Sequence, residues 1–160
     1  MSQFFTQNSD IIIKLLVALI LGTLVGAERV FVHKEAGMKT HAMVSMGAAI
    51  FVMISDQMAT KYIGLPGFNP TMMASQIIVG IGFLGAGVII FREQQSRLVG
   101  LTTASGLWVV AGIGMASGLG FFNIAIIATV LVLVILMTMN LLEKPLKKIS
   151  GINPDLPEIR

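Results

Sequence analysis

The chain has 160 residues, of which only 12% are charged and 55% are hydrophobic, and it contains 17 glycines and no cysteine. A soluble domain usually has about twice this share of charged residues, so the composition excludes an ordinary soluble enzyme, a disordered region and a nucleic-acid-binding arm. Without cysteine, neither a disulfide nor a thiolate metal site can form. Residues 15–27, 40–55, 62–91 and 98–142 contain no charged side chain. Since a charge-poor run of about 18 residues suits a bilayer, the sequence predicts an integral membrane protein.

The first predicted element is a membrane-spanning helix at about residues 11–28. Lys14 lies one turn inside it, where its long side chain can reach back to the nearer interface. A cleaved signal peptide is the competing interpretation. The first ten residues, however, carry no positive charge and end in Asp10, and Glu28-Arg29 follows the apolar run where a small-residue cleavage site would stand. We therefore expect an uncleaved helix.

Four further helices are predicted, at about residues 40–57, 71–91, 101–117 and 121–142. Asn69-Pro70 is typical of an N-cap followed by proline at the first helical position. The 45-residue window at 98–142 must contain two crossings, because a helix rises about 1.5 Å per residue and the hydrocarbon core is about 30 Å thick. The glycine turn at 117–120 divides it into a hairpin. We expect an all-α membrane domain of five transmembrane helices at residues 1–143, followed by a short basic cytoplasmic tail at 144–160.

The positions of the basic residues predict the orientation, because cytoplasmic loops are enriched in Lys and Arg. With five spans, the loops after the first and third helices and the tail share one side of the membrane. That side has nine of the eleven basic residues, namely Arg29, Lys34, Lys39, Arg92, Arg97, Lys144, Lys147, Lys148 and Arg160. The other side has Lys61, and Lys14 if it reaches outward. The N-terminus is therefore expected outside and the C-terminus in the cytoplasm.

Ionisable groups near helix interiors are functional candidates, because they are expensive to bury in a membrane. Glu28-Arg29 ends the first helix and Lys39-Thr40-His41 begins the second. The basic residues could simply anchor the chain among lipid headgroups. Glu28 needs a cationic or metal partner there, so three interpretations stay open: an ion pair with Arg29 or Lys39, a magnesium ligand, or a contact with a partner protein.

Further polar candidates lie on the third and fourth helices. Gln76 is expected to hydrogen-bond between helices, with ligand contact as the alternative. Thr102 and Thr103 follow Gly100, where capping or bonding to a helical carbonyl is favoured over ligand binding. His33 and His41 have no second metal ligand at helical spacing, so a transition-metal site is not expected.

Glycines recur at intervals that favour close helix packing. The segment from Gly80 to Gly85 matches the dinucleotide-binding fingerprint, but it lies within a predicted membrane helix and has no preceding strand. We interpret the small residues as packing faces that leave little central cavity. These predicted packing positions are Gly22, Gly26, Gly80, Gly82, Gly85, Gly87, Gly114 and Gly118. Trp108 and the eleven methionines are likewise expected to fill space.

Three sequence blocks together resemble the MgtC/SapB family. The first block has Gly-Ala-Glu-Arg at 26–29, Ala-Gly-Met-Lys-Thr-His at 36–41 and Val-Ser-Met-Gly-Ala-Ala at 44–49. The second is the glycine-rich segment at 76–90, and the third is Gly-Leu-Thr-Thr-Ala-Ser-Gly-Leu-Trp and its continuation at 100–115. The resemblance covers most of residues 20–130.

This resemblance implies a bacterial inner-membrane protein with five spans, linked to growth at low magnesium, acid adaptation and virulence. It also implies that such a protein can inhibit the F-type ATP synthase. Two departures stand out. Asn-Pro-Thr-Met at 69–72 replaces the family's Asp-Pro-x-Arg, which removes two charges. The soluble C-terminal domain of the virulence-associated members is also expected to be absent.

From these features we expect a protein that is not an enzyme and that binds and modulates another membrane complex, such as an ATP synthase, through small-residue faces. A homodimer is a further expected assembly, and nucleic acid is not an expected partner. The alternative function is a magnesium or other cation transporter. Magnesium is usually held by carboxylates, and a path across the membrane should show several, whereas Glu28, Asp56 and Glu93 all lie near interfaces. No cofactor is expected, although magnesium would be the ligand under the alternative.

Overall fold

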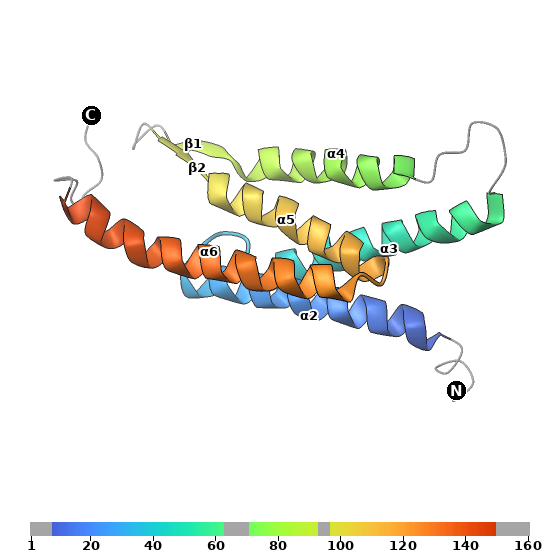
Figure 1. Ribbon diagram of the computed structural model, residues 1–160. Coiled ribbons are helices and arrows are strands. Elements are labelled where there is room, and N and C mark those ends of the chain that lie inside the picture. The colour runs from blue at the N-terminus through green and yellow to red at the C-terminus, as the bar shows by residue number, and fades with distance from the viewer. Residues whose placement is uncertain (1–7, 63–70, 93–96, 150–160) are drawn as a thin grey trace.

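The computed structural model describes residues 8–62, 71–92 and 97–149 (Figure 1). Its elements in chain order are α2 (Ser9–Phe31), α3 (Met38–Tyr62), α4 (Thr71–Val88), β1 (Ile90–Arg92), β2 (Arg97–Val99), α5 (Leu101–Gly118) and α6 (Phe122–Ile149). The predicted all-α class is confirmed, and each predicted helix has a counterpart. By length and composition, α2, α3, α5 and α6 are suited to cross a membrane.

Helix α4 is shorter than predicted. It ends at Val88, and residues 90–92 form β1, which pairs antiparallel with β2 in the register Ile90 to Val99. The predicted end at residue 91 is therefore wrong. Gly100 explains the break, because it adopts a φ of +95° and lies so close to α4 that an added Cβ would be 2.2 Å from the Val88 carbonyl oxygen. The 18 residues of α4 span about 27 Å, close to the thickness of a hydrocarbon core. The predicted N-cap at Asn69-Pro70 lies outside the described residues.

The turn between α5 and α6 lies at the predicted position and has a specific geometry. Gly120 adopts a φ of +80°, and its N–H donates to the Ser117 carbonyl at 3.0 Å, while the Phe121 N–H donates to the Ala116 carbonyl at 2.8 Å. These two bonds form a Schellman motif, which ends a helix at a left-handed glycine. The sequence therefore folds residues 101–149 into a helical hairpin.

Helix α5 lies at the centre of the molecule, between α4 and the pair formed by α2 and α6 (Figure 1). Side chains of α2, α5 and α6 meet in an apolar core that contains Leu21, Val25, Val110, Ile113 and Ala125. Glycines bring α3 close to both α2 and α5. A Cβ added at Gly26 would lie 2.6 Å from the Cα of Met38. A Cβ added at Gly114 would lie 2.0 Å from the carbonyl oxygen of Ser45. Gly22 and Gly118 make comparable approaches to the α3 backbone.

The packing role predicted for the α4 glycines is mostly wrong. An added Cβ at Gly80, Gly82 or Gly87 would meet nothing within 4 Å in the part of the chain that is described. Gly85 alone among the four faces a neighbour, with ordinary contact at 3.6 Å to the Ala104 Cβ. Trp108 is also not interior filler, since 55% of it is exposed. These three glycines therefore do not pack against the rest of the described chain.

The helices run lengthwise, so that α2 begins and α6 ends at opposite ends of the molecule (Figure 1). The α2–α3 connection, the β1–β2 hairpin and the end of α6 lie together at one end. Lys14 belongs to the other end, where it pairs with Asp10 at 2.7 Å and its Cε lies near Gly120. Among the basic residues with described side chains, Arg29, Lys34 and Lys39 thus lie toward the first end and Lys14 toward the other.

Candidate functional site

Glu28 and Arg29 form a buried ion pair at the end of α2. Only 4% of Glu28 and 1% of Arg29 are exposed. The Nε atom of Arg29 donates a hydrogen bond to the Oε2 atom of Glu28, and Nη2 forms an ion pair with the same oxygen. Of the three interpretations given for Glu28, the structure contains the ion pair with Arg29. Because the guanidinium cation already neutralises this carboxylate, the carboxylate is a poor magnesium ligand as it stands.

His41 lies in the first turns of α3, fully buried between α2 and α5. Its Nδ1 atom is 2.9 Å from the carbonyl oxygen of Gly37. A carbonyl can only accept a hydrogen bond, so Nδ1 carries the hydrogen and the neutral ring has its lone pair at Nε2. Nε2 is buried and has no hydrogen-bond partner among the described residues. It faces α5, where an added Cβ at Gly106 would lie 3.5 Å away.

Thr103 lies on the same face of α5 as Gly106 and is also buried. We call the four buried polar residues Glu28, Arg29, His41 and Thr103 the polar cluster. Thr103 is 1% exposed. Arg29 and Glu28 both act electrostatically on His41. Four of the eight predicted polar candidates, from three helices, are thus buried. Charged groups are costly to bury, so this arrangement requires good internal pairing.

The other four polar candidates lie elsewhere. Lys39, Thr40 and Thr102 are exposed near the same end of the molecule, and Gln76 is exposed on α4. Lys39 is therefore not enclosed with Glu28. The interhelical hydrogen bond expected of Gln76 is not found within the described residues.

Sequence reasoning missed Ser45, whose hydroxyl donates to the Ala18 carbonyl of α2 at 2.7 Å. Ser45 lies one helical turn after His41 and is fully buried. The spacing of these two polar residues on one face of the predicted helix was the available signal.

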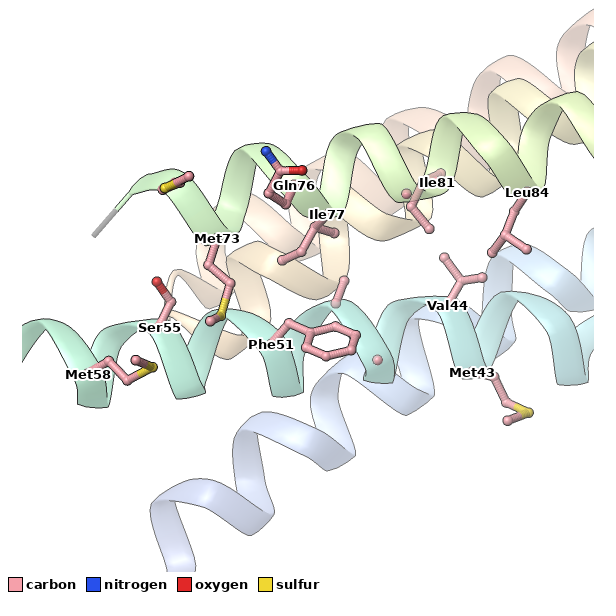
Figure 2. Close-up of a pocket in the computed structure, with 14 residues that line it drawn as sticks. Met43, Val44, Phe51, Ser55, Met58, Met73, Gln76, Ile77, Ile81 and Leu84 are labelled. Atoms are coloured by element: carbon pink, nitrogen blue, oxygen red, sulfur yellow. The ribbon is translucent and has the colours of Figure 1, made fainter. Parts of the chain in front are cut away.

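A second feature is a cleft of 890 Å³ between α3 and α4 (Figure 2). Its walls are largely apolar and rich in methionine, and the lining residues are Met43, Val44, Gly47, Ala48, Phe51, Ser55, Met58, Met72, Met73, Gln76, Ile77, Gly80, Ile81 and Leu84. Gly47 and Gly80 lie on opposite walls, and an added Cβ at either would meet nothing within 4 Å. The expectation of helices packed with little space between them is therefore wrong for α3 and α4. We call this feature the α3–α4 cleft.

Apolar helices suited to span a bilayer, packed through glycines around a polar cluster, define a multi-pass all-α membrane protein. The chain belongs to the MgtC family, whose sequence model matches residues 15–145. Within the described residues, no group of three His, Cys, Asp or Glu side chains is placed to hold a metal ion.

Three relatives illustrate the similarity. The chain is 47% identical over 122 residues to the protein MgtC of Salmonella typhimurium, covering 76% of this chain and 49% of that protein. It is 37% identical over 148 residues to a protein of Escherichia coli K12 named "Putative magnesium transporter YhiD", covering 86% and 66%. It is 40% identical over 134 residues to an uncharacterized protein of Haemophilus influenzae, covering 82% and 56%. The chain thus spans about half to two thirds of the length of these relatives. No solved structure matches it.

Proposed function

We propose that this chain is a bacterial inner-membrane protein that binds another membrane complex and modulates it during adaptation to low magnesium or acid stress. The F-type ATP synthase is the kind of complex that we have in mind. The α3–α4 cleft carries the proposal, and its occupant is a transmembrane helix of the partner.

The composition of the cleft supports an apolar occupant. Of the side chains that line it, only those of Ser55 and Gln76 are polar, and none is charged. Helix association in membranes depends on close packing, because lipid is as apolar as the helices themselves. Gly47 and Gly80 present backbone on both walls, so an incoming helix can approach closely. The methionines suit such a surface, because their flexible side chains adapt to different partners.

The size of the cleft also fits. Two turns of a helix with its side chains, about 10 Å wide and about 11 Å long, take up roughly 850 Å³. The cleft has a volume of 890 Å³. A partner helix lying along α3 and α4 could therefore seat about two turns within it.

The α3–α4 cleft provides a matched pair of variants on α4. Gly80→Leu puts a large side chain into the cleft, whereas Gly82→Leu adds the same side chain outside it. Both positions are open, so neither variant should disturb the fold. We expect Gly80→Leu to reduce the amount of complex that co-purifies from native membranes in mild detergent by about tenfold, which equals about 1.4 kcal/mol. Gly82→Leu should leave it unchanged.

The result would contradict the proposal if both variants retained the partner equally. If only a second copy of this chain co-purified, the occupant of the cleft would be that copy, and the protein would be a homodimer. Magnesium uptake into liposomes containing the purified chain, lost in Glu28→Gln, would instead favour the transporter function that the name of the Escherichia coli relative suggests. That outcome is not expected, because Arg29 already neutralises the Glu28 carboxylate.

The proposed orientation places the N-terminus outside and the C-terminus in the cytoplasm, as the basic residues indicate. The absence of cysteine makes the test direct. A membrane-impermeant maleimide applied to intact spheroplasts should label Ser9→Cys but not Lys34→Cys, since both positions are exposed but lie at opposite ends of the molecule. If only Lys34→Cys were labelled, the orientation would be the opposite of the proposed one.

A further inference from the structure

The Nε2 atom of His41 is a buried polar atom that has no hydrogen-bond partner among the described residues. Most buried polar atoms in proteins are hydrogen-bonded, and an exception calls for an explanation. The bond from Nδ1 to the Gly37 carbonyl fixes the hydrogen at Nδ1, so Nε2 has a lone pair directed toward α5. The missing partner is therefore either a hydrogen-bond donor or a proton.

The charges around His41 distinguish a proton from a metal ion. Arg29 and Glu28 are the charged groups that act on the ring. The Arg29 cation opposes a divalent metal, and among the described residues no group of three His, Cys, Asp or Glu side chains is placed to hold a metal ion. Helix α5 contributes Thr103 and Gly106, neither of which titrates between pH 5 and 8. The ion pair is neutral overall, so one added proton changes the net charge of the polar cluster from zero to about +1.

We propose that Nε2 of His41 is a proton-binding site and that proton uptake there loosens the packing of α2, α3 and α5 around the polar cluster. In the step, the Nε2 lone pair takes a proton from a hydronium ion of the solvent, which is left as water, and the ring becomes an imidazolium with hydrogens on both nitrogens. The new N–H has no acceptor among the described residues, and the new charge lies near Arg29. Both effects oppose close packing.

The position of His41 gives a proton a short route. Lys39 and Thr40 precede His41 directly and are exposed, and so are His33, Lys34 and Glu35 in the connection from α2. The packing that would loosen is also tight: an added Cβ at Gly26 would already lie 2.8 Å from the Gly37 carbonyl oxygen. Gly37 is the residue whose carbonyl holds the His41 ring. Movement of the ring is therefore transmitted directly to the contact between α2 and α3.

The chain offers a clean test because it has only two histidines. His33 is exposed and has a φ of +54°, which asparagine tolerates well, so His33→Asn leaves His41 as the single histidine without straining the turn. We would label this variant with ¹⁵N-histidine in lipid nanodiscs and follow the imidazole nitrogens from about pH 8 to about pH 5. The Nε2 signal should move from the range of a nitrogen with a lone pair to that of a protonated nitrogen, while Nδ1 stays protonated throughout.

Hydrogen exchange tests the consequence for packing. In the His33→Asn chain, amides at the end of α2 and the start of α3 should exchange severalfold faster when the pH falls. Adding His41→Asn, whose amide can still donate to the Gly37 carbonyl but cannot take up a proton, should abolish that dependence. Should His41→Asn fail to fold, the NMR titration of His33→Asn decides alone. If Nε2 kept its lone pair down to about pH 5, the proposal would be overturned in favour of a bound water. If hydrogen exchange depended equally on acid in the His33→Asn chain and in the double variant with His41→Asn, the packing step would be overturned.

Discussion

The contact between α3 and α5 at Gly114 allows a sharp test of the packing. An added Cβ there would lie 2.0 Å from the carbonyl oxygen and 2.8 Å from the Cα of Ser45. These are backbone atoms and cannot rotate away. To reach an ordinary contact of 3.4 Å, the two helices would have to separate by about 1.4 Å at this point. Overpacking of this kind costs about 1–3 kcal/mol, so Gly114→Ala should destabilise the protein by about that amount.

Gly112 provides the matched control, because it lies on the same helix and an added Cβ would meet nothing within 4 Å. Alanine is a better helix former than glycine by about 0.5–1 kcal/mol, so Gly112→Ala should be neutral or slightly stabilising. Thermal unfolding in detergent can be followed by the fluorescence of Trp108, the single tryptophan. We expect Gly114→Ala to lower the unfolding midpoint and Gly112→Ala to leave it unchanged or raise it slightly. Equal midpoints would mean that α3 and α5 do not approach as closely as Gly114 implies.

Two further predictions use the same unfolding assay. Glu28→Gln should destabilise the protein by about 3–5 kcal/mol, because it leaves Arg29 as a buried, unpaired charge. Adding Arg29→Met should restore part of this loss. A double variant no more stable than Glu28→Gln would contradict the pairing of Glu28 with Arg29. Gly100→Ala should lose at least about 1–2 kcal/mol, because Gly100 has a φ of +95° and lies against the Val88 carbonyl, whereas Gly87→Ala should be tolerated; equal stability of these two would contradict the turn geometry.

The helices could be predicted from the sequence because the bilayer limits where charges occur. Charge-free windows and span length were sufficient to place α2, α3, α5 and α6 within about five residues at each end, apart from the extension of α6 to Ile149. The end of α4 could not be predicted in this way. It depends on Gly100, which follows the β1–β2 hairpin and brings the chain back against Val88. A hydrophobic run containing Ile89 and Ile90 is equally compatible with a helix or a strand until that contact is known.

The faces of the glycine-containing helices were harder to predict than their positions. In a soluble protein an amphipathic pattern shows which side of a helix is buried. In a membrane, lipid and protein interior are both apolar, so the same pattern is weak. Gly22 and Gly114 therefore could not be distinguished by sequence from Gly82, although the first two approach the backbone of α3 and the third faces open space. The burial of His41 was missed for a related reason, since it depends on Gly106 of a distant helix.

Helix α3 connects the two candidate sites because it presents different faces to each. His41 and Ser45 lie on the face that packs against α2 and α5, whereas Met43 and Gly47 line the α3–α4 cleft. Both pairs have the spacing of one helical turn, so the two faces alternate along the same rigid segment. Interiors packed as tightly as that at Ser45 do not absorb strain locally. We therefore expect a change in packing around His41 to move the wall of the cleft as well, so that the proposed proton binding and the proposed partner binding would both act through α3.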